Sequence, residues 1–165
     1  MQENIPFYDV AILLATRGRT QALSNSVKSI IGKAAEKDKI QIIFAFDEDD
    51  DVGLTHFYKE IKPWLAQQKV NNKIIISERY GYAQLNRYYN LMANITESHW
   101  VMMWNDDAIM ETEGWDREIA AYNGEFKVLG VQTHNEHPFS IFPIVPKLWI
   151  RILGQMTRYQ EDQYL

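Results

Sequence analysis

Cysteine is absent from the 165 residues of this sequence. The chain therefore cannot form disulfide bonds, a thiolate nucleophile or a cysteine-built zinc site. A bound metal would have to be held by oxygen or imidazole ligands, which narrows the choice to a hard cation such as Mg²⁺ or Mn²⁺.

Long hydrophobic runs are absent as well. No apolar run approaches the roughly 20 residues that a transmembrane helix requires. The first residues, MQENIPFYD, lack the basic start and the apolar centre of a signal peptide. We therefore expect a cytoplasmic protein without a membrane span.

An excess of basic charge is also missing, because the formal net charge is −5. This charge argues against a broad electrostatic contact with nucleic acid, and we expect no nucleic-acid partner. The composition, with 46% hydrophobic and 24% charged residues, is typical of a globular protein. The length fits one domain, residues 1–165.

Five short runs of the sequence are almost continuously apolar. They are residues 9–15 (DVAILLA), 41–46 (QIIFAF), 73–77 (KIIIS), 100–104 (WVMMW) and 127–132 (KVLGVQ). Apolar residues that do not alternate with polar ones predict strands covered on both faces, as in a mostly parallel sheet.

Segments with helical spacing of apolar residues lie between these runs. They cover about 20–37, 54–65, 85–95 and 115–122. Thr20 is a candidate N-cap of the first, and Pro63 predicts a kink or an early end of the second. The alternation of strand and helix predicts an α/β domain, a mostly parallel sheet with helices on both faces.

Ligands of such sheets bind beyond the carboxyl ends of the strands. The polar residues that follow the apolar runs are Thr16 to Arg19, Asp47 to Asp51, Glu78 to Tyr82, Asn105 to Asp107, and Thr133 to His137. Cations and anions are therefore expected together along one edge of the sheet.

The run Asn105-Asp106-Asp107 directly follows a very apolar strand. Two adjacent carboxylates repel each other unless a cation or hydrogen-bond donors compensate, and Mg²⁺ and Mn²⁺ prefer oxygen ligands. We interpret the run as a metal site; the alternative is an exposed acidic turn.

Three further loops have a binding and a structural interpretation. Arg17 and Arg19 could contact phosphate oxygens, or belong to a solvated turn. Asp47 could accept a hydrogen bond from a base or ribose, whereas Glu48 to Asp51 are interpreted as a solvated loop. The same two interpretations apply to Arg79 with Gly81, and Asn86 lies in the following helix, where helix propensity does not favour an amide.

Two polar pairs near the end of the chain are less specific. His134 and His137 do not match a zinc signature, and we place them in a loop that borders the side of the site where a second substrate, the acceptor, would bind. Glu161 and Asp162 could supply a general base or belong to a frayed acidic tail. Trp149, Ile150 and Ile152 could form an interface, such as that of a homo-oligomer, if they are not in the core.

The order of these motifs resembles the nucleotide-diphospho-sugar transferase (GT-A, Rossmann-like) fold, most closely the family 2-like glycosyltransferases. The resemblance rests on VAILLATRGR (10–19), IIFAFDEDD (42–50), ERYGYAQLNRYYNLM (78–92) and WVMMWNDDAIMETEGWD (100–116). It implies a nucleotide-binding part at about 8–110 and an acceptor and catalytic part at about 111–165.

The resemblance also implies a role for each matching residue. The nucleoside diphosphate sugar, with UDP favoured, would be bound by Thr16, Arg17, Arg19, Asp47, Arg79, Gly81, Asn86 and Asp106. Asp107, Asp106 and Asn105 would hold Mn²⁺ or Mg²⁺. Asp162, with Glu161 second, would be the base that deprotonates an acceptor, which is an unknown glycan, protein or lipid.

The sequence departs from this family in two ways. The strict Asp-x-Asp motif is replaced by Asn-Asp-Asp, and the chain ends just after Asp162, as expected of a shortened enzyme from a compact genome such as that of a virus. The alternative function is a sugar-nucleotide-binding module without transfer activity. A sugar nucleotidyltransferase is disfavoured, because TRGRTQ is not a long glycine-rich loop with a lysine.

Overall fold

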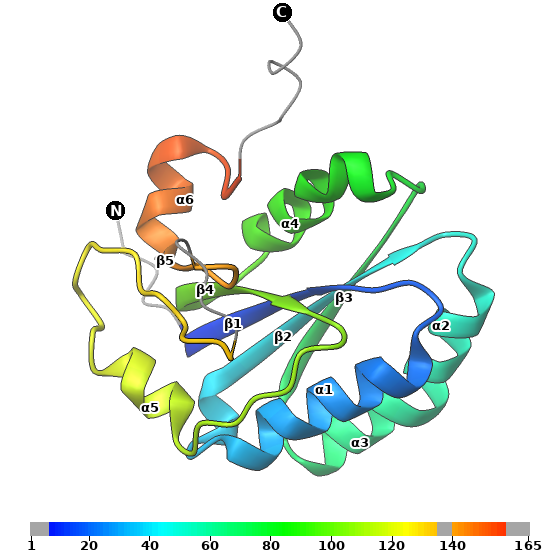
Figure 1. Cartoon of the computed structure of the whole chain (residues 1–165), viewed down its shortest axis with the longest axis horizontal. Helices are drawn as coiled ribbons and strands as arrows, with labels where there is room; N and C mark the ends of the chain where they lie inside the picture. Colours follow the sequence, from blue (N-terminus) through cyan, green and yellow to red (C-terminus); the bar gives the residue numbers. More distant parts are fainter. Residues whose placement is uncertain (1–6, 135–139, 158–165) are drawn as a thin grey trace, which may run out of the picture.

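A mixed β-sheet is the centre of the computed structural model, which describes residues 7–134 and 140–157 (Figure 1). Within these residues the sheet has five strands in the order β3-β2-β1-β4-β5. The strands are β1 (Tyr8–Ala15), β2 (Ile40–Asp47), β3 (Asn71–Ser77), β4 (Ser98–Asn105) and β5 (Ile144–Pro146). The first four are parallel, and β5 is antiparallel to β4.

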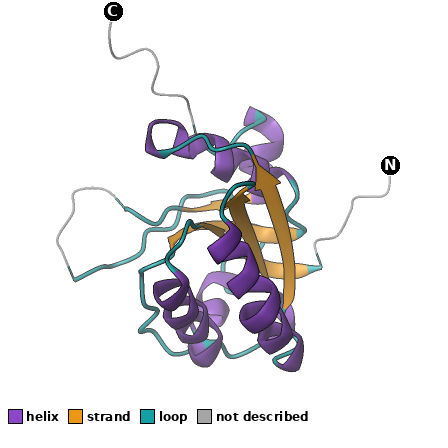
Figure 2. Ribbon diagram, turned by 90° about the vertical axis from the view of Figure 1, so that its right-hand side faces the viewer, coloured by secondary structure: helices purple, strands orange, loops and turns teal. Residues whose placement is uncertain are grey.

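Helices cover both faces of the sheet, as Figures 1 and 2 show. The helical elements are α1 (Thr20–Lys33), η1 (Lys37–Lys39), α2 (Asp51–His56), η2 (Phe57–Ile61), α3 (Lys62–Gln67), η3 (Tyr82–Gln84), α4 (Leu85–Asn94), α5 (Trp115–Ala120) and α6 (Lys147–Leu153). Helices α1, α3 and α5 share one apolar core with the sheet, and α4 and α6 share the other. The predicted α/β class, with helices on both faces, is confirmed.

The apolar runs of β1 and β2 follow from this burial on both faces. Along β1, Ile12 and Leu14 belong to the core on the side of α1, whereas Leu13 belongs to the core on the side of α4. All eight residues of β2 are buried. A strand between two helical layers has no solvent-facing side, so apolar residues need not alternate with polar ones. The first four predicted strands are confirmed.

The predicted fifth strand, residues 127–132, is wrong. This segment contributes a single bridge, between Leu129 and Ile144, and the side chain of Val128 is 51% exposed. The edge position beside β4 belongs to β5, whose Val145 pairs with Val101. Three residues ending in proline are too short to produce a recognisable periodic pattern, and for this reason the sequence did not reveal β5.

Two helix predictions also need correction. Thr20 is the first helical residue of α1 rather than its N-cap, which is Arg19 and makes no side-chain capping bond. The early end predicted at Pro63 is wrong, because the π-helical η2 precedes it and α3, which includes Pro63 in its first turn, continues beyond it. Of the residues predicted to form an interface if they are not in the core, Ile150 of α6 lies in the core and Ile152 is 64% exposed, and the interface itself stays a prediction.

No helix in the described part of the chain is long and apolar enough to cross a membrane.

Candidate functional site

A cleft of about 480 Å³ lies beyond the carboxyl ends of β1, β2 and β4 and beside the start of α4. Nine of the predicted site residues line it: Thr16, Arg17, Arg19, Asp47, Arg79, Gly81, Asn105, Asp106 and Asp107. Because β1 lies between β2 and β4, the loops that follow these three strands meet, and Thr16 contacts Asp106 across 90 positions of the sequence.

The acidic turn after β4 forms one side of the cleft. Asp106 is 6% exposed and accepts hydrogen bonds from the hydroxyl of Thr16 (2.7 Å) and from Nη1 of Arg19 (2.9 Å). The Nη2 of Arg19 donates to Asp107, whose carboxylate is half exposed (3.1 Å). This arrangement follows from the register, since Ala15 at the end of β1 pairs with Asn105 at the end of β4.

The two carboxylates of this turn face a common cation, the guanidinium of Arg19. Their charges, that of Asp106 first, raise the pKa of Arg19 above its usual value. The described residues contain no group of three or more acidic, histidine or cysteine side chains arranged to hold a metal. Asp106 and Asp107 therefore offer two protein ligands, and a divalent ion there would need further ligands from water or a substrate phosphate.

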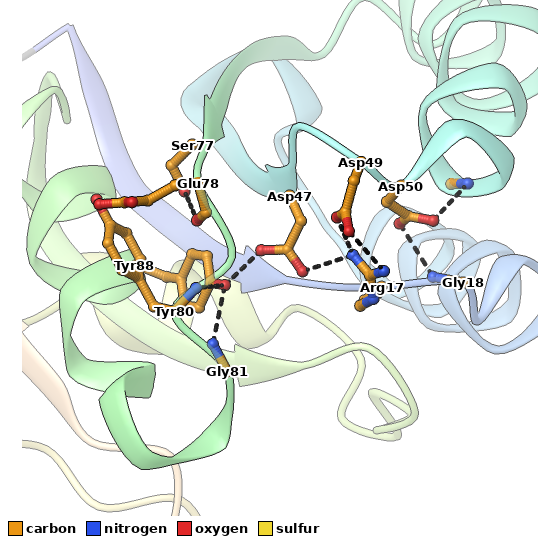
Figure 3. Close-up of polar contacts among 11 residues, drawn as sticks. Arg17, Gly18, Asp47, Asp49, Asp50, Ser77, Glu78, Tyr80, Gly81 and Tyr88 are labelled. Carbon is orange, nitrogen blue, oxygen red and sulfur yellow. Dashed lines mark hydrogen bonds and ion pairs between the residues drawn. The ribbon is translucent and has the colours of Figure 1, made fainter.

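The end of β2 forms the other side of the cleft, shown in Figure 3. Asp47 is 5% exposed and accepts a hydrogen bond of 2.9 Å from Nη1 of Arg17. Arg17 also donates to Asp49, and this hydrogen bond is the main reason that the pKa of Asp49 is lowered. Asp49 and Asp47 in turn raise the pKa of Arg17.

Tyr88 of α4 connects Asp47 to the loop after β3 (Figure 3). Its hydroxyl donates to Oδ1 of Asp47 and accepts hydrogen bonds from the backbone N–H groups of Tyr80 (2.7 Å) and Gly81 (3.3 Å). Burial, and then the hydrogen bond to Asp47, raises the pKa of Tyr88 above its usual value. A phenol is protonated at neutral pH in any case and can therefore donate this hydrogen bond. Gly81 has φ 72° and ψ −175°, a conformation that essentially only glycine adopts.

The predicted solvated loop from Glu48 to Asp51 is wrong for its last two residues. Asp50 is 5% exposed and is the N-cap of α2, because its Oδ1 accepts from the N–H of Gly53 (3.0 Å). Its Oδ2 accepts from the N–H of Gly18 (3.0 Å), which connects the α2 terminus to the loop after β1. Asp51 is the first residue of α2.

The remaining predicted residues are placed as follows. Arg79 is exposed at the cleft and makes no hydrogen bond or ion pair with the residues that the structure describes. Asn86 lies in the first turn of α4, and its amide nitrogen is buried without a partner among the described residues. Exposed His134 pairs with Glu111 (2.9 Å). Glu161, Asp162 and His137 lie outside the described residues.

Sequence reasoning missed the tyrosines of α4 as cleft residues. Tyr88 and Tyr89 both line the cleft, but the helical spacing predicted them only as core residues. Helical periodicity identifies the buried face of a helix and does not identify which hydroxyl on that face meets a carboxylate.

The pKa of Tyr89 provides a test of whether its hydroxyl is buried on this side of the sheet. Its hydroxyl donates to the backbone oxygen of Trp104 (2.8 Å), and burial, followed by the charge of Asp106, raises its pKa above the usual value of about 10. Above pH 10 the unfolded state therefore binds fewer protons than the folded state, and the free energy of unfolding falls as the pH rises.

Replacing Tyr89 with phenylalanine should remove this contribution, which is at most about 1.4 kcal/mol per pH unit. Urea unfolding between pH 8 and 11 measures it, with Tyr58→Phe as a control on an exposed tyrosine. Identical slopes for Tyr89→Phe and the wild type would contradict the prediction.

The chain is similar to solved glycosyltransferase structures. PcManGT, a mannosyltransferase from Pyrobaculum calidifontis solved with GDP-Man and Mn²⁺, matches with TM-score 0.71 and 10% identity over 92% of this chain and 48% of that chain. S. aureus TarS 1–349 with UDP-GlcNAc matches with TM-score 0.66 and 14% identity over 88% and 47%. GlyE of Streptococcus pneumoniae TIGR4 matches with TM-score 0.60 and 10% identity over 90% and 36%.

These similarities show the fold: the chain has the GT-A fold of nucleotide-sugar transferases, as the sequence resemblance predicted. The chain spans about half the length of the first two structures. Comparison with models of known protein families gives no match, and comparison with curated protein sequences gives none either.

Proposed function

We propose that this chain is a metal-dependent glycosyltransferase that binds a nucleoside diphosphate sugar in the cleft and transfers the sugar to an acceptor hydroxyl. The observation that carries the proposal is the meeting of two sites in one cleft. Asp106 and Asp107 converge on Arg19 at one side, and Asp47 is held by Arg17 and Tyr88 at the other. The GT-A fold supports this class of reaction.

The cleft residues divide between the parts of the donor. Asp47, buried and purely an acceptor, would take an N–H or O–H of the nucleoside. Arg79, which makes no ion pair with the described residues, would contact the diphosphate, as would Arg19 once a ligand competes for its carboxylate partners. Arg17 would do so by exchanging its exposed partner Asp49 for the ligand while it keeps its bond to Asp47. Thr16 would hold Asp106 in place, and Gly81 would allow the backbone to approach the ligand.

The metal would be held by Asp107 and Asp106, with Asn105 at the edge of the same turn. The donor set fits Mn²⁺ or Mg²⁺, because two carboxylates already face one cation and a substrate diphosphate can complete the oxygen ligands. When bound, such an ion supplies Lewis-acid neutralisation of the leaving diphosphate. The mannosyltransferase PcManGT was solved with GDP-Man and Mn²⁺, which supports this part of the proposal.

Transfer requires one bond to form and one to break. The acceptor hydroxyl oxygen bonds to the anomeric carbon of the sugar, the bond from that carbon to the diphosphate breaks, and the nucleoside diphosphate leaves. Asp162, with Glu161 as the second candidate, takes the hydroxyl proton. The cleft residues would position the donor for this displacement, which is a large part of such catalysis.

Calorimetric titration with UDP, GDP, CDP and ADP, with Mn²⁺ or with EDTA, tests donor binding. We expect at least one of them to bind and to bind more tightly with Mn²⁺. Release of nucleoside diphosphate from UDP-GlcNAc and GDP-mannose then tests turnover, with Asp162→Asn expected to bind the donor but not to turn it over. No binding in the whole panel would overturn the proposal, and binding without turnover would favour the sugar-nucleotide-binding module.

A further inference from the structure

The hydroxyl of Tyr88 uses its full hydrogen-bonding capacity. It has one hydrogen to donate and two lone pairs, and it donates to Asp47 while accepting from the N–H groups of Tyr80 and Gly81. The residue is 6% exposed, so water does not readily replace these partners. The ring is also held, because Tyr80 packs against it edge-on at 5.1 Å between centroids.

The hydroxyl belongs to a continuous chain of polar contacts (Figure 3). Asp49 binds Arg17, Arg17 binds Oδ2 of Asp47, and Tyr88 binds Oδ1 of Asp47 and the loop at residues 80–81. This series of contacts joins the loop after β1, the end of β2 and the loop after β3. Tyr88 therefore connects the carboxylate of Asp47 with the backbone of the loop after β3.

We propose that Tyr88 is a positioning residue that sets the nucleobase specificity of this cleft by orienting Asp47 against the loop of Tyr80 and Gly81. The inference rests on the proposed function. With one oxygen held by Tyr88 and the other by Arg17, the carboxylate of Asp47 is fixed in direction but retains lone pairs for a further donor.

A fixed carboxylate selects between classes of base. Uracil and guanine present a ring N–H that can donate to it, whereas cytosine and adenine present a ring nitrogen with a lone pair at the corresponding position. That lone pair would face the negatively charged acceptor and leave it without a hydrogen-bond partner. A carboxylate free to rotate would lose this discrimination.

The test compares UDP, GDP, CDP and ADP binding to the wild type and to Tyr88→Phe, which keeps the ring and removes the hydroxyl. We expect the better bound of UDP and GDP to lose about 10- to 100-fold in affinity, the range for a lost hydrogen bond to a charged group. CDP and ADP should lose less, so that the ratio of affinities falls by about 10-fold or more. Tyr58→Phe, which removes a tyrosine hydroxyl outside the residues that line the cleft, should keep the wild-type ratio.

Two further measurements separate positioning from a general structural effect. If Tyr88 acts through Asp47, the double variant Asp47→Asn/Tyr88→Phe should lose no more affinity than Asp47→Asn alone. Hydrogen exchange at the amides of Tyr80 and Gly81 should become faster in Asp47→Asn, and this measurement holds even if Tyr88→Phe folds poorly.

The outcomes distinguish this inference from the proposed function. Wild-type protein that binds none of the four nucleotides overturns both. Wild-type binding together with an unchanged affinity ratio in folded Tyr88→Phe, or additive losses in the double variant, overturns the role of Tyr88 and leaves the proposed function intact.

Discussion

Replacement of Asp107 with alanine is expected to remove the dependence of nucleoside diphosphate binding on Mn²⁺. The carboxylate is one of the two that converge on Arg19, and it is half exposed, so a metal and a substrate phosphate can both reach it. Loss of residues that merely support a metal ligand lowers metal affinity by about 10- to 100-fold, so loss of a ligand should cost at least about 100-fold.

Folding should change little in the same variant. An exposed ion pair contributes about 0–1 kcal/mol, and Arg19 keeps its bond to Asp106 when Asp107 is removed. Asp38→Ala is the matched control, because Asp38 is an exposed aspartate in η1, outside the cleft residues. Titration of each variant with Mn²⁺ and the best-bound nucleotide measures the effect. Wild-type Mn²⁺ dependence in Asp107→Ala would disprove its role as a ligand.

Replacement of Asp116 with alanine is expected to lower the free energy of unfolding more than replacement of Asp107 does. Its carboxylate is 3% exposed and accepts hydrogen bonds from the backbone N–H groups of Ala35 (2.7 Å) and Glu36 (2.7 Å), just beyond α1. The two preceding residues bind the same helix end: the N–H of Gly114 donates to Lys33 (2.8 Å) and the indole of Trp115 to Ile30 (2.9 Å).

The Gly-Trp-Asp turn is thus a clamp on the carboxyl end of α1, and Asp116 is its charged part. One hydrogen bond to a charged group contributes about 1.5–3 kcal/mol, so the loss of two in Asp116→Ala should lower the free energy of unfolding by at least this amount. For a domain of this size, that corresponds to a fall in melting temperature of roughly 3–12 °C. Thermal unfolding followed by circular dichroism measures it.

Glu118→Ala is the matched control for Asp116→Ala, since Glu118 is an exposed acid of the same helix and should give a change below about 0.5 kcal/mol. An Asp116→Asn variant retains one acceptor oxygen and should fall between the two. A melting temperature in Asp116→Ala equal to that of the control would show that the clamp does not need the carboxylate.

The interior of the fold could be predicted more fully than its edges. The four parallel strands, β1 to β4, each have an apolar run of at least three residues because helices cover both faces of the sheet. Such a run can be recognised in the sequence without knowledge of the fold. Residues 127–132 carry the same signal without forming a strand, since only Leu129 finds a partner at the sheet edge. An edge position depends on which segment arrives there, and local composition does not specify that.

The residues of the cleft could likewise be predicted in part. Local sequence was enough to predict which polar residues follow the buried strands, among them Arg19, Asp47 and Asp106, because the change from apolar to polar residues marks the end of a strand. Their partners depend on the folded arrangement: Arg19 binds Asp106, Arg17 binds Asp47, and Tyr88 lies between Asp47 and the loop after β3. The contacts with the two carboxylates join residues 30 to 87 positions apart, and the order of the strands in the sheet, rather than any local pattern, brings them within hydrogen-bond distance.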